Sequence, residues 1–280
     1  MAQDEDTRHG SAERRWREDL AAWAIPQHIL DAAPESPWHF PVELFARRAD
    51  AAQSRMTAST LRALEALPMD GSVLDVGCGA GAASLPLAAK TSGLIGVDPS
   101  AAMLKEFRVR AQAAGVEVQT VRGAWPEAAA RTPAVDVVVC HHVAYNAPGL
   151  AAFADRLSDH ARRRVVLELT AGHPLSTTND LWIRFHGLAR PERPTADDAH
   201  AVLREAGLDP GREEWTPARG VGFAERRDLV AWVRRRLCLG PERDAEVEAA
   251  LAGRIRVGDD GTVGFDPQPV VTFWWDGGAA

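Results

Sequence analysis

The sequence contains few cysteines and few lysines. Its three cysteines, Cys78, Cys140 and Cys238, are far apart, with no CxxC pair and no histidine at zinc spacing. We therefore expect neither a disulfide framework nor a metal site. Only two of the 32 basic residues are lysines, and the formal net charge is -7. This acidic balance disfavours general binding to DNA.

Long apolar runs are also missing. No stretch approaches the length needed to cross a bilayer, and the amino terminus is acidic and lacks the apolar segment of a secretory signal. We expect no membrane partner and a cytoplasmic location. The 280 residues are 46% hydrophobic, which is enough for a large packed core. The sequence carries no signal for an oligomeric state.

The most informative stretch runs from Val73 to Gly81 and reads VLDVGCGAG. A short β-branched segment passes through three alternate glycines into the alanine- and leucine-rich residues 82–90, for which we expect a helix. Glycine permits unusual backbone angles and lets a ligand approach the main chain closely. The stretch therefore predicts a strand, a tight turn and a helix that together form the floor of a cofactor site.

Two cofactor classes fit this floor, because Gly77, Gly79 and Ala82 also satisfy the dinucleotide pattern. Asp75 favours the other class, since its carboxylate would repel a pyrophosphate and attract an ammonium or a sulfonium group. Asp98 ends the next predicted strand, 94–97, and is placed to accept hydrogen bonds from ribose hydroxyls. An NAD-dependent oxidoreductase remains the less favoured alternative.

Three segments then resemble one family: residues 74–81, residues 96–104 and, more weakly, residues 136–140. The chain resembles the class I S-adenosylmethionine-dependent methyltransferases over about residues 57–217 and the last strand. This resemblance implies S-adenosyl-L-methionine as the cofactor. It also implies an α/β fold with a seven-stranded, mostly parallel Rossmann-like sheet covered by helices on both faces.

The resemblance also implies a set of cofactor-binding residues around the first four strands. For Trp125, packing on the adenine ring and ordinary core packing are equally compatible with the sequence. The set is Asp75, Gly77, Cys78, Gly79, Gly81, Asp98, Pro99, Met103, Gly123, Ala124, Trp125, Cys140 and His141.

Strand and helix patterns alternate along the chain, as in βαβ units. We expect a helical cap or lid over residues 1–56 and a methyltransferase domain over 57–280, with a helical insertion at about 218–266 before the last strand. Thr57 is expected to cap one helix, and Thr195 to begin another. Asp260 and Gly261 indicate a hairpin. The arginine runs 162–164 and 234–236 are expected on solvated helix faces, with contact to an anionic substrate as the alternative for either run.

Methyl transfer from a sulfonium mainly requires alignment and the exclusion of water, and a base is needed only when the acceptor carries a proton. Three histidines, His141, His142 and His173, follow the predicted fourth and fifth strands. They are the candidate catalytic bases, with a purely structural role as the alternative for each. Glu168 interrupts a buried strand, so it must be paired, protonated or facing a cavity.

The acceptor pocket is predicted between the carboxyl ends of the fourth and fifth strands. Its roof is expected from the helix bearing Trp16 and Trp23, unless that helix only covers the core, and from residues 182–186. The candidate substrate-binding residues are Tyr145, Asn146, Trp182 and His186.

The sequence lacks the motifs of amine-directed nucleic-acid methyltransferases and the prolyl-cysteine of cytosine C5 methylation after the fourth strand. We therefore expect methyl transfer to an oxygen or nitrogen atom of a small molecule. A methyltransferase of RNA or protein, and a non-catalytic binder of the cofactor, remain alternatives.

Overall fold

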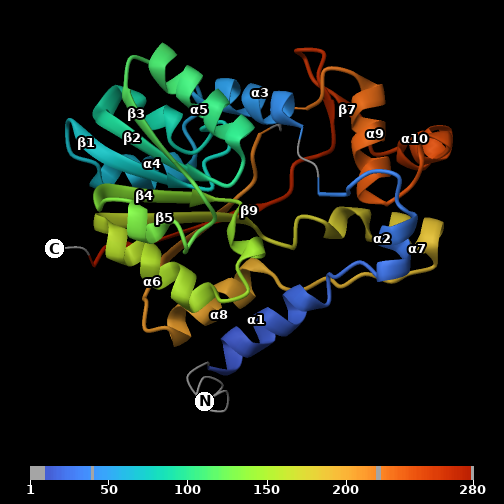
Figure 1. Ribbon diagram of the computed structural model, residues 1–280, viewed down its shortest axis with the longest axis horizontal. Coiled ribbons are helices and arrows are strands. Elements are labelled where there is room, and N and C mark those ends of the chain that lie inside the picture. The colour runs from blue at the N-terminus through green and yellow to red at the C-terminus, as the bar shows by residue number, and fades with distance from the viewer. Residues whose placement is uncertain (1–9, 39–40, 219–221, 279–280) are drawn as a thin grey trace.

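The computed structural model describes residues 10–38, 41–218 and 222–278. Its centre is a seven-stranded sheet in the order β3-β2-β1-β4-β5-β9-β6, in which β9 runs antiparallel to both neighbours and the other pairs are parallel (Figure 1). This is the mostly parallel Rossmann-like methyltransferase fold predicted from the sequence. The strands are β1 (Gly71–Val76), β2 (Thr91–Asp98), β3 (Glu117–Arg122), β4 (Val135–His141), β5 (Ala161–Thr170), β6 (Gly211–Trp215) and β9 (Val270–Asp276).

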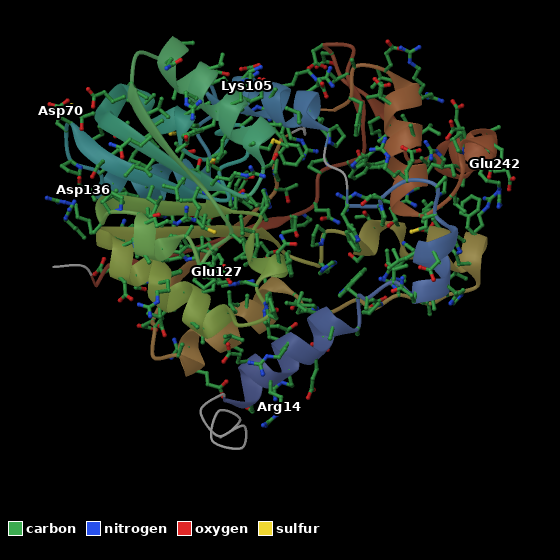
Figure 2. The ribbon with its side chains drawn as sticks, viewed as in Figure 1. Arg14, Asp70, Lys105, Glu127, Asp136 and Glu242 are labelled. Atoms are coloured by element: carbon green, nitrogen blue, oxygen red, sulfur yellow. The ribbon has the colours of Figure 1, made fainter. Side chains whose placement is uncertain are left out.

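The strand order reverses beside β1, which pairs with β2 on one side and β4 on the other. Asp70 and Asp136, labelled at the left of Figure 2, mark the amino ends of β1 and β4. The carboxyl ends of the parallel strands therefore point toward the opposite side of the molecule. An open α/β sheet binds its ligands at this end, next to the reversal.

Helices cover both faces of the sheet. One face packs against α3 (Val42–Ala52), α4 (Ala58–Ala66), the 3-10 helix η1 (Leu85–Lys90) and α5 (Ala101–Ala113). The other packs against α1 (Ser11–Ala21), α6 (Leu150–His160) and α8 (Ala196–Glu205), seen below the sheet in Figure 1. Both sides bury the apolar side chains of central strands such as β4, which explains the three consecutive valines at 137–139.

A third apolar cluster lies beyond the carboxyl ends of the strands, and we refer to it as the helical unit. Residues that are distant in sequence pack together there, including Ile29, Leu181 and Val233. Figure 1 shows its helices to the right of the sheet. The unit comprises α2 (Gln27–Ala32), α7 (Asn179–His186), α9 (Arg226–Arg236), α10 (Asp244–Leu251) and the hairpin strands β7 (Arg256–Val257) and β8 (Val263–Gly264).

Several predicted chain signals are confirmed. Thr57 caps α4 by accepting a hydrogen bond from the Thr60 N–H, and Thr195 forms a capping box with Asp198 at the start of α8. Gly261, with φ of 77°, lies in the turn between β7 and β8. These local signals persist because each satisfies backbone groups without help from distant residues.

Two predicted elements were wrong in detail. Residues 82–90 do not form an α-helix: turns run through Ser84 and are followed by η1. Pro86 removes a backbone donor, and β2 begins directly after Lys90, so no room remains for several α-helical turns. Arginines 162–164 lie in β5 rather than on a helix, because α6 ends at His160.

Four short 3-10 helices complete the described elements. They are η2 (Ala129–Arg131), η3 (Ala144–Asn146), η4 (Ser176–Thr178) and η5 (Pro241–Arg243). Among the described residues, none of the helices has both the length and the apolar composition needed to span a bilayer.

Candidate active site

The glycine loop after β1 is held in backbone conformations that favour glycine. The φ angles of Gly77, Gly79 and Gly81 are 70°, 50° and 101°. A Cβ atom on Gly77 would lie 2.3 Å from a methyl group of Val143, so this position also requires close packing. The loop is anchored to β2, because the N–H groups of Gly77 and Cys78 both donate to the carbonyl of Val97.

Asp98, at the end of β2, lies beside this loop. One carboxylate oxygen accepts from the Gly79 N–H at 3.0 Å and the other from the Ser100 N–H at 2.8 Å. Burial raises the pKa of Asp98, and these two hydrogen bonds oppose that rise. Ser100 also caps α5 through the Met103 N–H, so the segment containing Pro99 has a fixed path. Each Asp98 oxygen retains lone pairs for a further donor.

Asp75 lies beneath the loop and is only 1% exposed. Its carboxyl group accepts a hydrogen bond from the Ser84 hydroxyl at 2.6 Å. Burial raises the pKa of Asp75 to about 7 despite that hydrogen bond, and the charge of Asp98 acts in the same direction. Asp75 therefore supports the loop from below by holding the turn that contains Ser84.

The loop after β3 lies against the same site. The Gly123 N–H donates to the Asp98 carbonyl at 3.2 Å, which also brings Ala124 close. Trp125 is 9% exposed, its ring meets His160 edge-on, and its indole donates to the Phe153 carbonyl at 3.4 Å. The Trp125 ring thus packs within the core, as in the packing alternative.

The two cysteines of the predicted cofactor set are both buried. Cys140 is completely inaccessible within β4, and Cys78 packs on the other side of the sheet. Burial raises the pKa of each thiol well above its ordinary value. Neither is therefore suited to act as a nucleophile, and only their backbone groups are available to a cofactor.

Two candidate bases meet Glu168 where β4 and β5 end. The Nε2 atom of His142 lies 3.0 Å from a Glu168 oxygen, while Nδ1 of His141 lies 3.8 Å from the same oxygen. His142 has φ of 61°, and its side chain is 54% exposed. His141 is mostly buried, its Nε2 atom has no hydrogen-bond partner, and burial lowers its pKa. The imidazole of His141 is therefore mostly buried, and that of His142 is open to solvent.

Glu168 is held as an anion by polar groups from three elements. Its burial would raise its pKa, but the imidazoles of His141 and His142 and the Ser59 hydroxyl together lower it to about 2. Ser59, on α4, lies 2.5 Å from the second carboxylate oxygen and 2.6 Å from the Thr272 hydroxyl. The sequence indicated that Glu168 needs a partner, but it did not predict Ser59 and Thr272.

The third candidate, His173, occupies a different environment. Its ring stacks on Trp23 at a centroid distance of 3.8 Å and meets Tyr145 edge-on at 5.0 Å. Burial, followed by the charge of Arg190, lowers the pKa of His173 to about 3. Its Nδ1 atom accepts from the Leu175 N–H at 3.3 Å. His173 is therefore a neutral member of an aromatic stack and is separate from the Glu168 cluster.

The candidate substrate-binding residues are in four different situations. The Tyr145 hydroxyl donates to the Thr170 carbonyl at 2.8 Å, and the Asn146 amide donates to the Val143 carbonyl at 3.3 Å. His186 Nε2 lies 2.7 Å from the Leu237 carbonyl. Trp182 lines a pocket.

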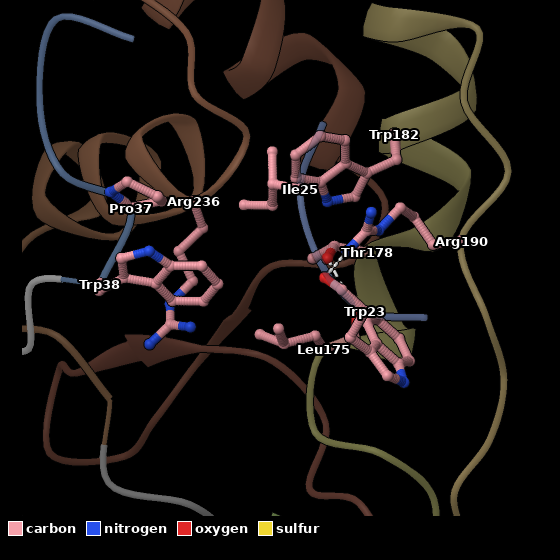
Figure 3. A pocket seen from close by; sticks show the side chains of 9 residues that line it. All are labelled: Trp23, Ile25, Pro37, Trp38, Leu175, Thr178, Trp182, Arg190 and Arg236. Carbon is pink, nitrogen blue, oxygen red and sulfur yellow. Dashed lines mark hydrogen bonds between the residues drawn. The ribbon is translucent and has the colours of Figure 1, made fainter. Parts of the chain in front are cut away.

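That pocket lies between the helical unit and the segment after β5. Its empty volume is about 330 Å³, part of which is open to solvent. Figure 3 shows Trp38 and Arg236 on one side, Trp182, Arg190 and Trp23 on the other, and Leu175 between them. The lining residues are Trp23, Ile25, Pro37, Trp38, Leu175, Thr178, Trp182, Arg190 and Arg236.

The sequence did not identify Trp38 or Arg190 as a site residue, and it offered Arg236 only within an arginine run whose alternative role was contact with an anionic substrate. Arg236 was expected on a solvated face, and no local pattern brings it together with residues 23–38. Within the described residues, no group of three or more His, Cys, Asp or Glu is placed to hold a metal ion.

Comparisons with known proteins found one matching family model and several similar structures. Residues 73–163, about a third of the chain, match the family model of a methyltransferase domain. A Bacillus halodurans C-125 protein assigned to the methyltransferases has a similar structure, with a TM-score of 0.52, 18% identity and coverage of 78% of this chain and 97% of that one. No curated protein sequence is detectably similar to the chain.

Two further structures are less similar. The YcgJ protein of Bacillus subtilis has a TM-score of 0.49 and 16% identity, covering 79% of this chain and 98% of that one. The magnesium protoporphyrin IX methyltransferase of Synechocystis PCC 6803, solved with bound SAH, has a TM-score of 0.46 and 22% identity, covering 64% and 79%.

The sheet order and the glycine loop at its reversal define a class I Rossmann-like α/β protein. Within that class, residues 73–163, which run from β1 into β5, match the model of a methyltransferase domain.

Proposed function

We propose that this protein transfers a methyl group from S-adenosylmethionine to an oxygen or nitrogen atom of a small-molecule acceptor. The observation that carries the proposal is the position of Asp98, whose two oxygens are fixed by the Gly79 and Ser100 N–H groups beside a glycine loop. A carboxylate oriented in this way can accept hydrogen bonds from the two hydroxyls of a ribose.

The residues around the loop fit such a cofactor. Among the described residues, a Cβ atom on Gly79 would have only Phe45 nearby, at 3.5 Å, so the loop offers bare backbone to a ligand. Gly77, Gly79, Gly81 and Asp98 would hold the ribose and the amino-acid end, and Gly123 and Ala124 would border the adenine. The bound cofactor supplies an electrophilic methyl group.

The chain's own residues then align the acceptor, exclude water and accept its proton. His142 is the base favoured by the geometry, because it is exposed and its Nε2 atom faces the Glu168 anion at 3.0 Å. With the proton on Nε2, this hydrogen bond leaves Nδ1 free to take a proton from the acceptor. Glu168 would stabilise the imidazolium that results.

Calorimetric titration with S-adenosylmethionine and with NAD tests the cofactor. The Asp98→Ala variant should bind S-adenosylmethionine more weakly by about 1.5 to 3 kcal/mol, the usual loss for hydrogen bonds to a charged group. The matched control is Asp136→Ala, which removes a carboxylate bound to Ser72 at the other end of the sheet. Binding of NAD alone, or unchanged affinity in Asp98→Ala, would rule out the assignment.

The acceptor class is tested by following labelled methyl groups in a cell extract. We expect the label in the metabolite fraction. Label confined to RNA or protein would replace the small-molecule acceptor with a macromolecule, and binding without any transfer would indicate a non-catalytic role.

A further inference from the structure

Three side chains behind Glu168 extend its hydrogen bonding across the sheet to β6. The Ser59 hydroxyl lies 2.5 Å from the Oε2 atom of Glu168 and 2.6 Å from the Thr272 hydroxyl. The Trp215 indole N–H lies 3.0 Å from the same Thr272 hydroxyl. Ser59 and Thr272 are completely buried, and Glu168 is 6% exposed. A hydrogen bond lost here is therefore not replaced by one to water.

The hydrogen bonds of this chain run in one direction. An indole N–H can only donate, so the Thr272 hydroxyl accepts from Trp215 and keeps its own proton to donate. At the other end, the Glu168 carboxylate accepts from the Ser59 hydroxyl. Ser59 therefore accepts from Thr272, although the distance between the two hydroxyls is compatible with either donor. The hydroxyl proton of Ser59 is thus directed at Glu168.

His142 lies on the other side of the same carboxylate. Its backbone N–H donates to the Glu168 carbonyl at 2.7 Å, and its Nε2 atom lies 3.0 Å from Oε1 of Glu168. Because Ser59 occupies Oε2, the carboxylate presents Oε1 to the imidazole. Burial would raise the pKa of Glu168, but the imidazoles of His141 and His142 and the Ser59 hydroxyl lower it. Glu168 therefore meets Nε2 as an anion that can only accept.

The protonation of Glu168 decides which nitrogen of His142 is free. An anionic Glu168 accepts from the Nε2–H group and leaves Nδ1 with a lone pair for the proton of the methyl acceptor. A neutral Glu168 would donate its own proton to Nε2, and the imidazole proton of His142 would move to Nδ1. The Nδ1 atom could then no longer act as a base. Ser59 opposes this exchange, because its own proton already faces the carboxylate.

We infer that Ser59 is a positioning residue that keeps the imidazole proton of His142 on Nε2 by donating to Glu168. Thr272 and Trp215 fix the direction of the Ser59 hydroxyl. The effect of Ser59 on methyl transfer rests on the proposed function. Its effect on the His142 proton does not, because that effect follows from the hydrogen bonds alone.

The first experiment locates the imidazole proton. Nitrogen NMR of the full chain, labelled at histidine, distinguishes a protonated from an unprotonated ring nitrogen, and the His142→Ala spectrum identifies the signals of His142. At mildly alkaline pH, wild type should carry the proton on Nε2. In Ser59→Ala, a substantial fraction of His142 should carry it on Nδ1. A wild-type proton on Nδ1, or the same distribution in both proteins, would overturn the inference.

Two variants of Thr272 separate the hydroxyl from packing. Thr272→Val keeps the shape and removes the hydroxyl, so it should shift the His142 proton in the same direction as Ser59→Ala, to a smaller extent. Thr272→Ser removes a methyl group and keeps the hydroxyl, so it should resemble wild type. A purely structural role predicts the reverse order, because Thr272→Ser leaves a buried cavity. That reverse order, or no shift in Thr272→Val, would overturn the role of Thr272.

The opposite face of β9 offers matched controls. Thr272 and Trp275 are three positions apart in this strand, so their side chains lie on opposite faces. The Trp275 indole donates to the Ser158 hydroxyl at 2.8 Å, and Ser158 donates to the Ala154 carbonyl at 3.0 Å. Ser158→Ala and Trp275→Phe should leave the His142 proton on Nε2, whereas Trp215→Phe should shift it as Thr272→Val does. Equal shifts in the controls would mean a general loosening of the fold and would contradict the inference.

Methyl transfer tests the catalytic consequence. Initial rates of label transfer from S-adenosylmethionine to the metabolite fraction of a cell extract should fall about tenfold or more in Ser59→Ala, while calorimetry finds unchanged cofactor affinity. If wild type transfers no label but its His142 proton responds to Ser59→Ala, the proposed function fails and the positioning stands. If Ser59→Ala transfers label as fast as Ser158→Ala, the function stands and the positioning role fails.

Discussion

The glycine loop and the pocket beside β5 are built in contrasting ways. The loop and Asp98 come from one stretch of fewer than thirty residues, and backbone N–H groups hold them in position. The pocket combines residues 23–38, 175–190 and 236, and its walls are held by packing of the helical unit. A site fixed by its own backbone is recognisable from sequence, whereas a site assembled by packing is not.

The two carboxylates at the strand ends repeat this contrast. Asp98 is satisfied by N–H groups of its own loop and of the neighbouring glycine turn. Glu168 depends on side chains from elsewhere in the chain, His142 and Ser59 among them. Loss of one distant side chain can therefore disturb Glu168, whereas the backbone groups that hold Asp98 do not depend on any distant side chain for their hydrogen bonds.

The amino-terminal segment contributes one tryptophan to the core, Trp16, and another to the pocket, Trp23. Trp16 is fully buried, stacks on Tyr145 and donates to the Ala147 carbonyl at 2.8 Å. Trp16→Ala should therefore destabilise the protein by about 3 to 5 kcal/mol, as for other buried aromatics. Trp23→Ala should also destabilise the protein, because Trp23 is buried and stacks on His173, and it should in addition weaken acceptor binding, because Trp23 lines the pocket. Urea unfolding and acceptor titration measure the two effects.

The opposite result would restore the lid interpretation of α1. A Trp16→Ala protein that is as stable as wild type and binds cofactor, but has lost turnover, would mean that this helix covers the reaction rather than the core.

The next largest expected effect concerns His142, the proposed general base. His142→Ala should lower turnover by about a hundredfold or more, the usual contribution of a general base, with cofactor affinity unchanged. The matched control is His28→Ala, which removes an exposed histidine of α2. His173→Ala should not change the pH dependence of the rate near neutrality, because a pKa of about 3 keeps His173 neutral there. Full activity of His142→Ala would show that alignment alone suffices.

The sheet was predictable because its signals are local and repeated. The valine-rich β4, the glycine turn after β1 and the caps at Thr57 and Thr195 each determine their own segment. The helix expected over residues 82–90 failed because the short connection to β2 and Pro86 outweighed its alanine content. The arginines 162–164 were misplaced because charge alone does not distinguish a helix face from an exposed strand end.

The site was predictable only in part. Spacing identified Asp98, and an interrupted apolar strand identified Glu168, but Ser59 lies 109 positions away from Glu168. Arg190 and Arg236 line the same pocket only after the helical unit has packed. No periodicity in the sequence predicts that arrangement, because each arginine on its own resembles an ordinary surface residue.

Asp75 should make the stability of the folded protein depend on pH. Burial raises its pKa to about 7 in the folded state from an ordinary value of 3.8, so the folded protein holds this proton more tightly than the unfolded chain. The stabilisation is present at low pH and is lost as pH rises toward 7. Each pKa unit corresponds to 1.36 kcal/mol, and pH 5 lies two units below the pKa of about 7, so from pH 5 to 8 wild type should lose about 2.7 kcal/mol relative to Asp75→Asn.

Thermal unfolding of both proteins across this pH range provides the measurement. Asp136→Asn is the control, because hydrogen bonds from Ser72 lower the pKa of Asp136 against the effect of burial. Its contribution is lost only in acid, so its difference from wild type should stay constant from pH 5 to 8. A constant difference for Asp75→Asn as well would mean that Asp75 is ionised in the fold.

The smallest expected effect concerns Tyr145. It tests whether the hydroxyl of Tyr145 stabilises the fold or contacts the acceptor. Its hydroxyl already donates to the Thr170 carbonyl at 2.8 Å, and its ring is held between Trp16 and His173. Tyr145→Phe keeps the ring and removes one hydrogen bond, so it should cost about 1 kcal/mol of stability. Turnover should remain close to that of wild type. If the hydroxyl instead oriented the acceptor, turnover would fall while the unfolding free energy stayed the same, and Tyr145 would belong with the pocket rather than with the core.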